Sequence, residues 1–494
     1  MQAAAYERLS VQDRSFLVFE RPGLPMHLGG VAILEGGPLV GANGSVSLTA
    51  LRAHIRARLH LAPRYRQRLA FVPVLQRPVW VDDTGFDLRR HVRRARLPEP
   101  ADAEALKRLA GSLFSLPVDR AHPLWEMWLI DGLGAGRFAL LAKTHHAMAD
   151  GISAFGLFAA LLSGTPEVAD ERPLRWKPRP VPGPVTLLSE QITHEMRAPA
   201  GLGRDLANTL GRPAQLSQKI AVRARAVAGL LRVGLMPPAK TTLNQPVGPQ
   251  RHFDWLSLDL AEAKRVKARL GGTLNDVILA TISGALRRFL GVDRVGVRGS
   301  DYRVVVPVSV RAAAAAGRTD NRVSAWLTSL PLDESDPVER LRQVQGATAR
   351  LKGEEHALGP ELLMRVAEGV PPGLVDLGVR LTAWLHPYNL IVSNVSGPAA
   401  PLYLRGARLC AAYPQVPLFE HQGLGIGLFS VGGSLCWGFH ADPELVPDLW
   451  RLVESVRASF GELRQASEGA GPAISSRARR SWSSTRASSA NSSS

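Results

Sequence analysis

Two adjacent histidines and an aspartate lie within one short segment of the chain, His145-His146-Ala-Met-Ala-Asp150-Gly151. The ordinary pKa of histidine is about 6.5, so a neutral imidazole can take a proton from a hydroxyl group near neutral pH. We therefore interpret the segment as a general-base site, in which one histidine faces the reactants and the other is buried against the scaffold. Asp150 would hold the turn through an ion pair or hydrogen bonds, and Gly151 would supply backbone freedom.

Two other interpretations of this segment stay open. A buried histidine commonly serves only packing and hydrogen bonding. A metal site is the second alternative, because histidine and aspartate are good ligands. Adjacent residues on an extended strand point to opposite faces, so His145 and His146 would not easily share one ion, and no cysteine-rich or glutamate-rich cluster stands nearby. We expect no metal.

The flanking segments predict a strand before the histidines and a helix after them. Residues Arg137–Thr144 are apolar and typical of a buried strand, and residues Ile152–Leu162 are apolar over a helical length. A further strand, Trp125–Ile130, and a glycine-rich turn, Asp131–Gly136, come before them. Catalytic groups are often presented at such junctions, which favours the general-base interpretation.

The chain has 494 residues, too many for one ordinary core, so we expect two domains. Residues 172–184 are rich in proline and arginine, as linkers often are. The expected organisation is an N-terminal α/β unit over residues 1–180, a linker and helical connector over 181–249, a second α/β unit over 250–464 and a disordered Ser/Arg-rich tail over 465–494.

Both units combine predicted strands with predicted helices. An amphipathic helix is expected over Leu51–Leu59. In the second unit a helix begins at Thr273, with Thr273 or Asn275 as its cap, and continues to Leu290. The other expected elements are the strands Tyr302–Val310 and Leu390–Val395, a strand pair over Leu424–Phe439 that turns at Gly432-Gly433, and a last helix over Pro443–Leu463.

The chain is basic, with 60 Lys and Arg against 43 Asp and Glu and a formal net charge of +17. A basic surface suits nucleic acid, anionic lipid or a polyanionic cofactor. We exclude nucleic acid, because no zinc-finger, homeodomain or aromatic RNA-binding motif occurs. An arginine-rich, lysine-poor composition is also typical of GC-rich genomes, so the charge alone does not establish a partner.

The sequence predicts a cytoplasmic protein that does not span a membrane. It has only two cysteines, Cys410 and Cys436, which suits a reducing compartment. We find no signal peptide and no run of about 18 uncharged apolar residues. The basic, amphipathic stretch Lys219–Arg232 suits docking on anionic lipid, although a solvated connector packed on both domains is the favoured interpretation.

The sequence resembles the bacterial wax ester synthase/diacylglycerol acyltransferases. This family belongs to the CoA-dependent acyltransferase superfamily, with chloramphenicol acetyltransferase and the condensation domains of peptide synthetases. The paired-histidine segment is the superfamily motif. The branch is indicated by further segments in the right order over nearly the whole chain, which are Leu9-Ser10-Val-Gln-Asp13-Arg-Ser-Phe16-Leu with Met26-His27-Leu-Gly29-Gly30, Pro123-Leu124-Trp125, Asn275-Asp276, and Ser393-Asn394-Val-Ser-Gly397-Pro398.

The resemblance implies an α/β fold of two chloramphenicol-acetyltransferase-like subdomains, each a mixed β-sheet backed by helices, around a central tunnel. Acyl-CoA, the co-substrate, would enter from one side and diacylglycerol or a long-chain alcohol from the other. His146 would be the general base, His145 a supporting residue, and Asp150 and Gly151 structural parts of the site. The thioester is already activated, so neither an acyl-enzyme nor a permanently bound cofactor is expected.

The other motif residues have plainer expected roles. Pro123, Leu124 and Trp125 would pack in the core, with Trp125 lining the acyl tunnel. Ser393 and Asn394 would shape a turn at the domain junction. All of these, with the pair Asn275-Asp276, are candidate substrate, tunnel or oxyanion residues, although helix capping is the favoured role for Asn275; the set is Pro123, Leu124, Trp125, Asn275, Asp276, Ser393 and Asn394.

Two positions depart from the pattern of the family. Asp320-Asn321 stands where relatives usually carry Gly-Asn, and Ser430 is followed by Val431 where many have tyrosine. These changes leave acceptor selectivity open.

The expected function is transfer of a long-chain acyl group from acyl-CoA to diacylglycerol, giving triacylglycerol, or to a long-chain alcohol, giving a wax ester. The expected location is peripheral, on a membrane or lipid inclusions. The alternatives are a polyketide- or carrier-linked acyltransferase of the same superfamily and a non-catalytic lipid-surface protein.

Overall fold

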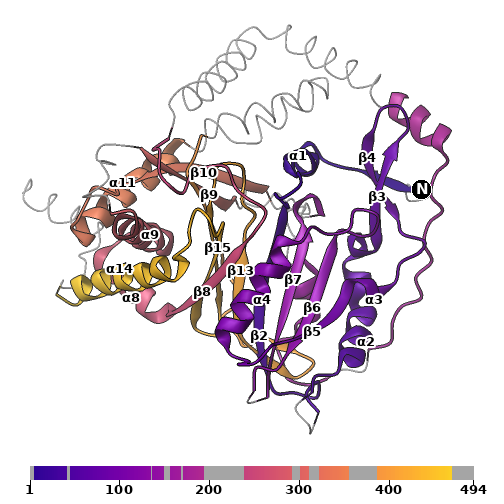
Figure 1. Ribbon diagram of the computed structural model, residues 1–494, viewed down its shortest axis with the longest axis horizontal. Helices are drawn as coiled ribbons and strands as arrows, with labels where there is room; N and C mark the ends of the chain where they lie inside the picture. The colour runs from indigo at the N-terminus through magenta and orange to yellow at the C-terminus, as the bar shows by residue number, and fades with distance from the viewer. Residues whose placement is uncertain are drawn as a thin grey trace, which may run out of the picture.

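A computed structural model describes residues 5–41, 45–134, 136–148, 156–168, 171–193, 238–291, 301–310, 322–354 and 387–469. Within these ranges the chain forms two six-stranded sheets and one three-stranded sheet (Figure 1). Asp150, Gly151, Asp320, Asn321 and the stretch Lys219–Arg232 lie outside the described residues.

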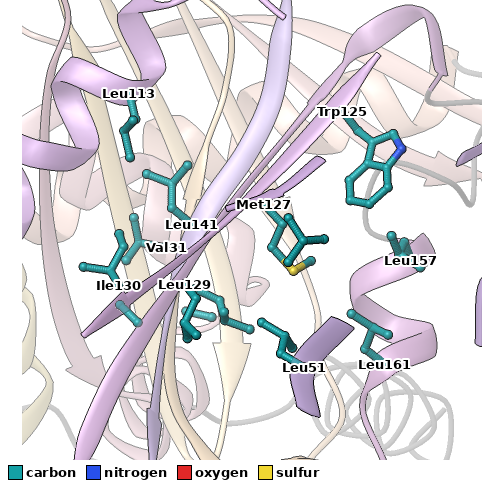
Figure 2. Packing of buried hydrophobic residues seen from close by; sticks show 14 of the residues in the cluster. Val31, Leu51, Leu113, Trp125, Met127, Leu129, Ile130, Leu141, Leu157 and Leu161 are labelled. Atoms are coloured by element: carbon teal, nitrogen blue, oxygen red, sulfur yellow. The ribbon is translucent and has the colours of Figure 1, made fainter. Parts of the chain in front are cut away.

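The first sheet carries the paired histidines. Its strands, in spatial order, are β12 (Tyr403–Leu404), β13 (Ala407–Gln415), β2 (His27–Glu35), β7 (Arg137–His145), β6 (Trp125–Asp131) and β5 (Val92–Arg96). Helices α2 (Leu48–Arg58), α3 (Leu88–His91), α4 (Ala103–Ser115) and α5 (Gly156–Leu161) accompany these strands. Figure 2 shows Leu51, Leu157 and Leu161 turned toward Met127 and Trp125, so α2 and α5 bury one face of the sheet.

Two strands of the first sheet come from the far end of the chain. β13 pairs antiparallel with β2 from Arg408↔Glu35 to Gln415↔Gly29, and in Figure 1 the orange-yellow β13 lies between the indigo β2 and the second sheet. β13 also runs very close to the second sheet: a Cβ on Gly438 would lie 1.9 Å from the carbonyl oxygen of Pro414. Only glycine fits there, so the two halves meet backbone against backbone.

The second sheet has the strand order β10-β9-β11-β14-β15-β8. Its strands are β10 (Arg322–Leu330), β9 (Tyr302–Val310), β11 (Leu390–Val395), β14 (Leu424–Val431), β15 (Ser434–Ala441) and β8 (His252–Asp259), and its helices are α8 (Leu260–Leu270), α9 (Leu274–Leu290), α11 (Pro337–Glu354) and α14 (Leu449–Gly469). The helices gather on one face of this sheet (Figure 1), where α9 and α14 pack closely on each other.

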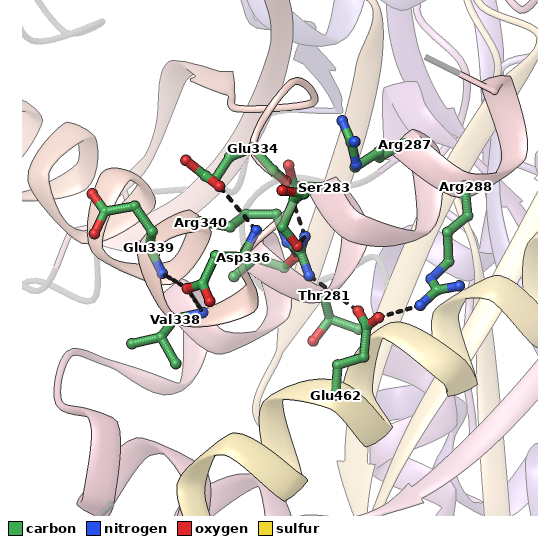
Figure 3. A network of polar contacts seen from close by, with 12 residues as sticks. Thr281, Ser283, Arg287, Arg288, Glu334, Asp336, Val338, Glu339, Arg340 and Glu462 are labelled. Carbon is green, nitrogen blue, oxygen red and sulfur yellow. Dashed lines mark hydrogen bonds and ion pairs between the residues drawn. The ribbon is translucent and has the colours of Figure 1, made fainter. Parts of the chain in front are cut away.

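Polar contacts hold these helices together. Arg340 of α11 is buried, and its Nε donates to the carbonyl of Ala280 on α9 at 3.2 Å. Its Nη2 lies 3.4 Å from Glu462 of α14, which also pairs with Arg288 of α9 (Figure 3). A buried guanidinium needs such partners, so Arg340 ties three helices at one point.

A small sheet stands apart from the two cores. It consists of β1 (Tyr6–Arg8), β4 (Arg77–Asp82) and β3 (Gln67–Val72), and β3 and β4 form a hairpin. A helix over residues 184–193 covers one face of it, with Leu187 packed against Val72 and Val81. The proline-rich linker before this helix is irregular, as predicted, and Arg179 fixes it to Asp82 at 2.8 Å.

Most of the predicted elements are confirmed. β6, β7, β9, β11 and the β14–β15 pair occupy the expected segments, and Thr273 caps α9 in a capping box with Asp276. The predicted helix after the histidines is described only from Gly156 onward. The last helix is shifted: it begins at Leu449 and ends at Gly469, so residues 465–469 continue α14 and the tail predicted to start at 465 was wrong there. The domain boundaries remain a prediction.

Candidate active site

The paired histidines lie where β7 ends. His145 is the last residue of β7, and His146 begins a single 3-10 turn, η3 (His146–Met148). The amide of His145 donates to the carbonyl of Leu124 at 2.9 Å, and the amide of His146 donates to the carbonyl of Met26 at 2.8 Å. The turn is therefore held by the segments that lead into β6 and β2.

His145 faces the protein interior and is completely buried. Its Nδ1 accepts a hydrogen bond from the amide of Ala147 at 3.0 Å. An accepting Nδ1 carries no proton, so the proton sits on Nε2. That Nε2 lies 3.4 Å from Oε1 of Glu20, which fixes both the tautomer and the orientation of the ring.

Glu20 is held as a carboxylate beside His145. Glu20 directly follows helix α1 (Val11–Phe19). Its carboxylate accepts hydrogen bonds from the amide of Met26 at 3.2 Å and from Nε of Arg120 at 2.8 Å. Burial alone would raise the pKa of Glu20, but His145 and Arg120 outweigh it and lower the pKa to about 2. The negative charge is thus present near neutral pH.

His146 lies against the aromatic ring of Phe16 on α1. The two rings are stacked, with centroids 3.5 Å apart and planes at 14°. The Nδ1 of His146 is buried, whereas part of the residue remains accessible. Burial lowers the pKa of His146 to about 3, so the ring is neutral near pH 7.

Further buried polar groups lie on the same face of the sheet as His145. His27 pairs with His145 across β2 and β7, with the ring centroids 6.4 Å apart. Lys143, two positions before His145, is fully buried and donates to the carbonyls of Leu113 and Leu116 at 3.0 and 2.8 Å. A cation at the carboxyl end of a helix is favourable, so Lys143 anchors α4 to β7.

An apolar cavity of about 450 Å³ is lined by β7, the strand that leads into the histidine turn, although neither His145 nor His146 is among its lining residues. Thr144 and Ala142 of β7 line it, together with Trp125 and Met127 of β6. Its opposite wall comes from the second half of the chain, where Val395–Pro398, Ala412–Pro414 and Phe429 contribute. The volume falls in the usual range for a ligand pocket, and the lining suits a hydrocarbon chain.

Pro123, Leu124 and Trp125 are buried, as expected for the core. Trp125 is stacked on His91 with centroids 4.6 Å apart, and its Nε1 donates to the carbonyl of Tyr65 at 2.9 Å. The motif therefore does two things: Leu124 receives the amide of His145, and Trp125 forms part of the cavity wall.

Ser393 and Asn394 lie within strand β11, not in a turn, and pair in parallel with Gly427 and Leu428. The end of the same motif is nearer to the cavity. The amide of Gly397 donates to Oγ of Ser430 at 3.1 Å, and a Cβ at position 397 would lie 2.2 Å from the carbonyl oxygen of Ser430. The glycine lets this segment close the cavity wall.

Asn275 and Asp276 occupy the first turn of α9 in the second half. Asp276 accepts from the amide of Thr273 at 2.7 Å and from the hydroxyl of Thr348 at 2.7 Å. Thr273, not Asn275, is the cap. The contacts of Asp276 are those of a helix start, and they connect α9 to α11.

Metal ligands do not gather in the part of the chain that the structure describes, where no group of three or more His, Cys, Asp or Glu could hold an ion. No helix in the described ranges is both long and apolar enough to cross a membrane.

Comparison with known proteins decides the family. The model of the wax ester synthase/diacylglycerol acyltransferase catalytic domain matches residues 9–278, and that of the WS/DGAT C-terminal domain matches residues 319–464. The chain belongs to the wax ester synthase/diacylglycerol acyltransferase family. It is an acyltransferase, and the predicted family is confirmed.

Related sequences agree over nearly the full length. A Mycobacterium tuberculosis protein named as a diacylglycerol O-acyltransferase is 32% identical over 476 residues, which cover 94% of this chain and 91% of the relative. The M. tuberculosis protein named tgs1, also as a diacylglycerol O-acyltransferase, is 31% identical over 460 residues, 92% of this chain and 95% of the relative.

Solved structures confirm the predicted fold class. The wax ester synthase/diacylglycerol acyltransferase from Marinobacter aquaeolei VT8 has a TM-score of 0.67 at 24% identity, over 94% of this chain and 100% of that one. A starter condensation domain of rhizomide synthetase, in complex with C8-CoA and Leu-SNAC, has a TM-score of 0.57 at 16% identity, over 95% and 97% of the two chains.

Several residues of this wax ester synthase/diacylglycerol acyltransferase site were missed at the sequence level. Glu20, Arg120 and Lys143 carry no motif of their own in a single sequence. Phe16 belongs to the opening motif, but nothing in its spacing predicts that it stacks on His146. The one available signal was the adjacency of Phe16 and Glu20 to the Met26-His27 segment, which pairs directly with β7.

Proposed function

We propose that this acyltransferase moves a long-chain acyl group from acyl-CoA to the hydroxyl of diacylglycerol or a long-chain alcohol, with His146 as the general base. The observation that carries the proposal is a neutral imidazole in the turn that directly follows Thr144, a residue that lines an apolar cavity. The names of the mycobacterial relatives support diacylglycerol as an acceptor, and that of the Marinobacter enzyme supports both kinds of product.

The proposed reaction is a direct transfer. His146 removes the proton of the acceptor hydroxyl as the oxygen attacks the thioester carbonyl carbon of acyl-CoA. The tetrahedral intermediate collapses, the carbon–sulfur bond breaks, and the imidazolium returns the proton to the CoA thiolate. General-base assistance of this kind is worth about 10²- to 10⁴-fold in rate.

The other residues of the site would position His146 without touching the reactants. Phe16 stacks on the ring of His146 and fixes its plane, and the carbonyl of Met26 accepts a hydrogen bond from the backbone amide of His146. His145, oriented by Glu20 and Ala147, fixes the turn that presents His146. Asp150 and Gly151 keep their proposed role as the architecture of this turn.

The acyl chain would lie in the cavity of about 450 Å³, with Trp125 as one wall. The net charge of +17 suits the phosphates of CoA, which arginine and lysine bind readily. A water-insoluble acceptor also implies work at a lipid surface, so we place the enzyme peripherally on a membrane or lipid inclusions.

The test is CoA release by the purified full chain with palmitoyl-CoA, offered diacylglycerol and hexadecanol in parallel. His146→Ala should lower the rate by about 100-fold or more, with the fold intact by circular dichroism. His252→Ala, at an exposed histidine on β8, is the matched control and should keep the full rate. Near-normal transfer by His146→Ala, or activity with acyl-carrier donors alone, would overturn the proposal.

A further inference from the structure

The hairpin of β3 and β4 exposes apolar side chains at its tip. Phe71 is 50% exposed and Val74 is 83% exposed. Ile192, on the helix over residues 184–193 that packs on the hairpin, is 43% exposed. In Figure 1 the hairpin and this magenta helix stand together at one extremity of the described fold. Large exposed apolar side chains that gather in one place mark an interaction site.

The backbone at the tip is strained. Val74 has φ of 64°, and Gln76 has φ of 50°. A positive φ is a genuine outlier for a β-branched residue, and asparagine or glycine would adopt it at lower cost. The chain thus carries a strained valine that is exposed to solvent, and backbone strain of this kind clusters at functional sites.

Basic residues outnumber acidic ones on the hairpin. Its one acidic residue, Asp82, ends β4 away from the tip and pairs with Arg179 at 2.8 Å. Glu7 of the neighbouring strand β1 pairs with Arg64 at 2.7 Å. Residues 60–81 contain four arginines, Arg64, Arg66, Arg68 and Arg77, and no aspartate or glutamate. Arg68 and Arg77 lie on the two strands of the hairpin itself. An apolar tip with a basic base matches an interface between hydrocarbon and anionic headgroups.

The hairpin is also connected to the acyl cavity. Tyr65, which lines that cavity, lies in the short helix η2 (Pro63–Arg66) directly before β3. The carbonyl of Tyr65 receives the indole N–H of Trp125, another wall residue. A hairpin seated in lipid would therefore hold the cavity close to the lipid surface.

We propose that the β3–β4 tip, with Phe71, Val74 and Ile192, is the element by which this enzyme inserts into an anionic lipid surface to reach its acceptor. The inference rests on the proposed function for the identity of that acceptor, but the binding itself does not require catalysis. The proposed lipid-binding surface is therefore the hairpin of β3 and β4, in the first half of the chain.

Lipid binding is tested by flotation of the full chain with vesicles of phosphatidylcholine alone or mixed with phosphatidylglycerol. The double variant Phe71→Thr, Val74→Asn removes both apolar side chains and keeps the fold, because threonine suits an edge strand and asparagine suits a positive φ. Its thermal midpoint should be unchanged or higher. Binding to the mixed vesicles should weaken by about tenfold or more. Trp450→Gln, which removes a 58% exposed side chain from α14, should bind like the wild type.

Kinetics separate this inference from the proposed function. The double variant should lose CoA release with diacylglycerol in mixed vesicles and keep it with a short-chain alcohol dissolved in buffer. Equal loss with both acceptors, or undiminished flotation, would overturn the docking role. A shift from dimer to monomer without a change in flotation would assign the tip to a second copy and also overturn it. If the wild type releases no CoA with any acceptor, the proposed function fails while the flotation result still stands.

Discussion

Oε1 of Glu20 lies 3.4 Å from Nε2 of His145 and accepts from the amide of Met26 at 3.2 Å. The carbonyl of the same Met26 receives the amide of His146. One carboxylate therefore braces both members of the histidine pair, His145 through its ring and His146 through the backbone. The residue sits at the end of α1, more than a hundred positions away in the chain.

Glu20→Gln should slow the reaction through the position of His146. The amide keeps the size of the side chain but loses the charge that holds His145 and Arg120, so we expect kcat to fall about tenfold with KM little changed, and the free energy of unfolding to fall by about 1–3 kcal/mol. Steady-state CoA release and urea denaturation measure the two effects. Glu35→Gln, at an exposed carboxylate paired with Arg408, is the control and should change neither. A wild-type kcat in Glu20→Gln would contradict the bracing role.

Phe16→Leu should loosen the ring of His146. The stacked contact at 3.5 Å disappears, and aromatic contacts of this kind are worth about 0.5–1.5 kcal/mol. We expect kcat to drop about 2- to 10-fold, and Phe16→Tyr to keep most of the rate because its ring can stack in the same way. Comparing kcat of the two variants in the CoA-release assay shows whether stacking on His146 contributes to the rate. If leucine and tyrosine give the same rate, stacking has no part in catalysis.

Buried histidines make the fold sensitive to acid. Burial lowers the pKa of His146 and of His440 to about 3, from an ordinary value of 6.5. Between these pH values the unfolded chain binds protons that the folded chain does not, so stability must fall as the pH falls from 6.5 toward 3. Glu20, with its pKa lowered from 4.5 to about 2, adds a loss of the same sign between those two values.

His440→Gln should therefore flatten the dependence of unfolding free energy on pH between 6.5 and 3, as measured by urea denaturation across that range. His252→Gln, at an exposed position, serves as the control and should leave the slope as in the wild type. An unchanged slope in His440→Gln would mean that this histidine becomes protonated without unfolding.

Ala142→Leu should shorten the preferred acyl chain. Ala142 lines the cavity from β7, and a leucine there would take the space of several methylene groups. Each methylene that can no longer be buried costs about 0.8 kcal/mol, so the preference for palmitoyl-CoA over octanoyl-CoA should fall about tenfold or more in kcat/KM. Ala121→Leu, on the exposed loop before β6, should not alter the ratio. An unaltered chain-length preference in Ala142→Leu would place the acyl chain elsewhere.

Local patterns in the sequence predicted the strands and helices that carry the site. The apolar runs of β6 and β7 and the Thr273 cap of α9 depend on neighbours in the chain, so a single sequence contains them. The paired histidines were placed correctly at the end of a strand, with His145 buried.

Long-range partners were not predictable in the same way. The pairing of β13 with β2 joins residues more than 370 positions apart, and nothing in either strand specifies the other. Glu20 was missed because a glutamate after a short helix is common at the surface, and only its contacts with His145 and Arg120 distinguish it. The prediction of a tail from residue 465 was wrong up to Gly469 because Leu463 and Ser467 are buried against the rest of the fold.

The insertion of β13 beside β2 has a consequence for biosynthesis. During translation, β2, β7, β6 and β5 can pair with one another, but β2 keeps an open edge until residues 407–415 have left the ribosome. The nascent first half must therefore wait, with a strand edge open to aggregation, for most of the polypeptide to be synthesised. A chaperone dependence of the truncated first half, absent from the complete chain, is the expected mark of this order of events.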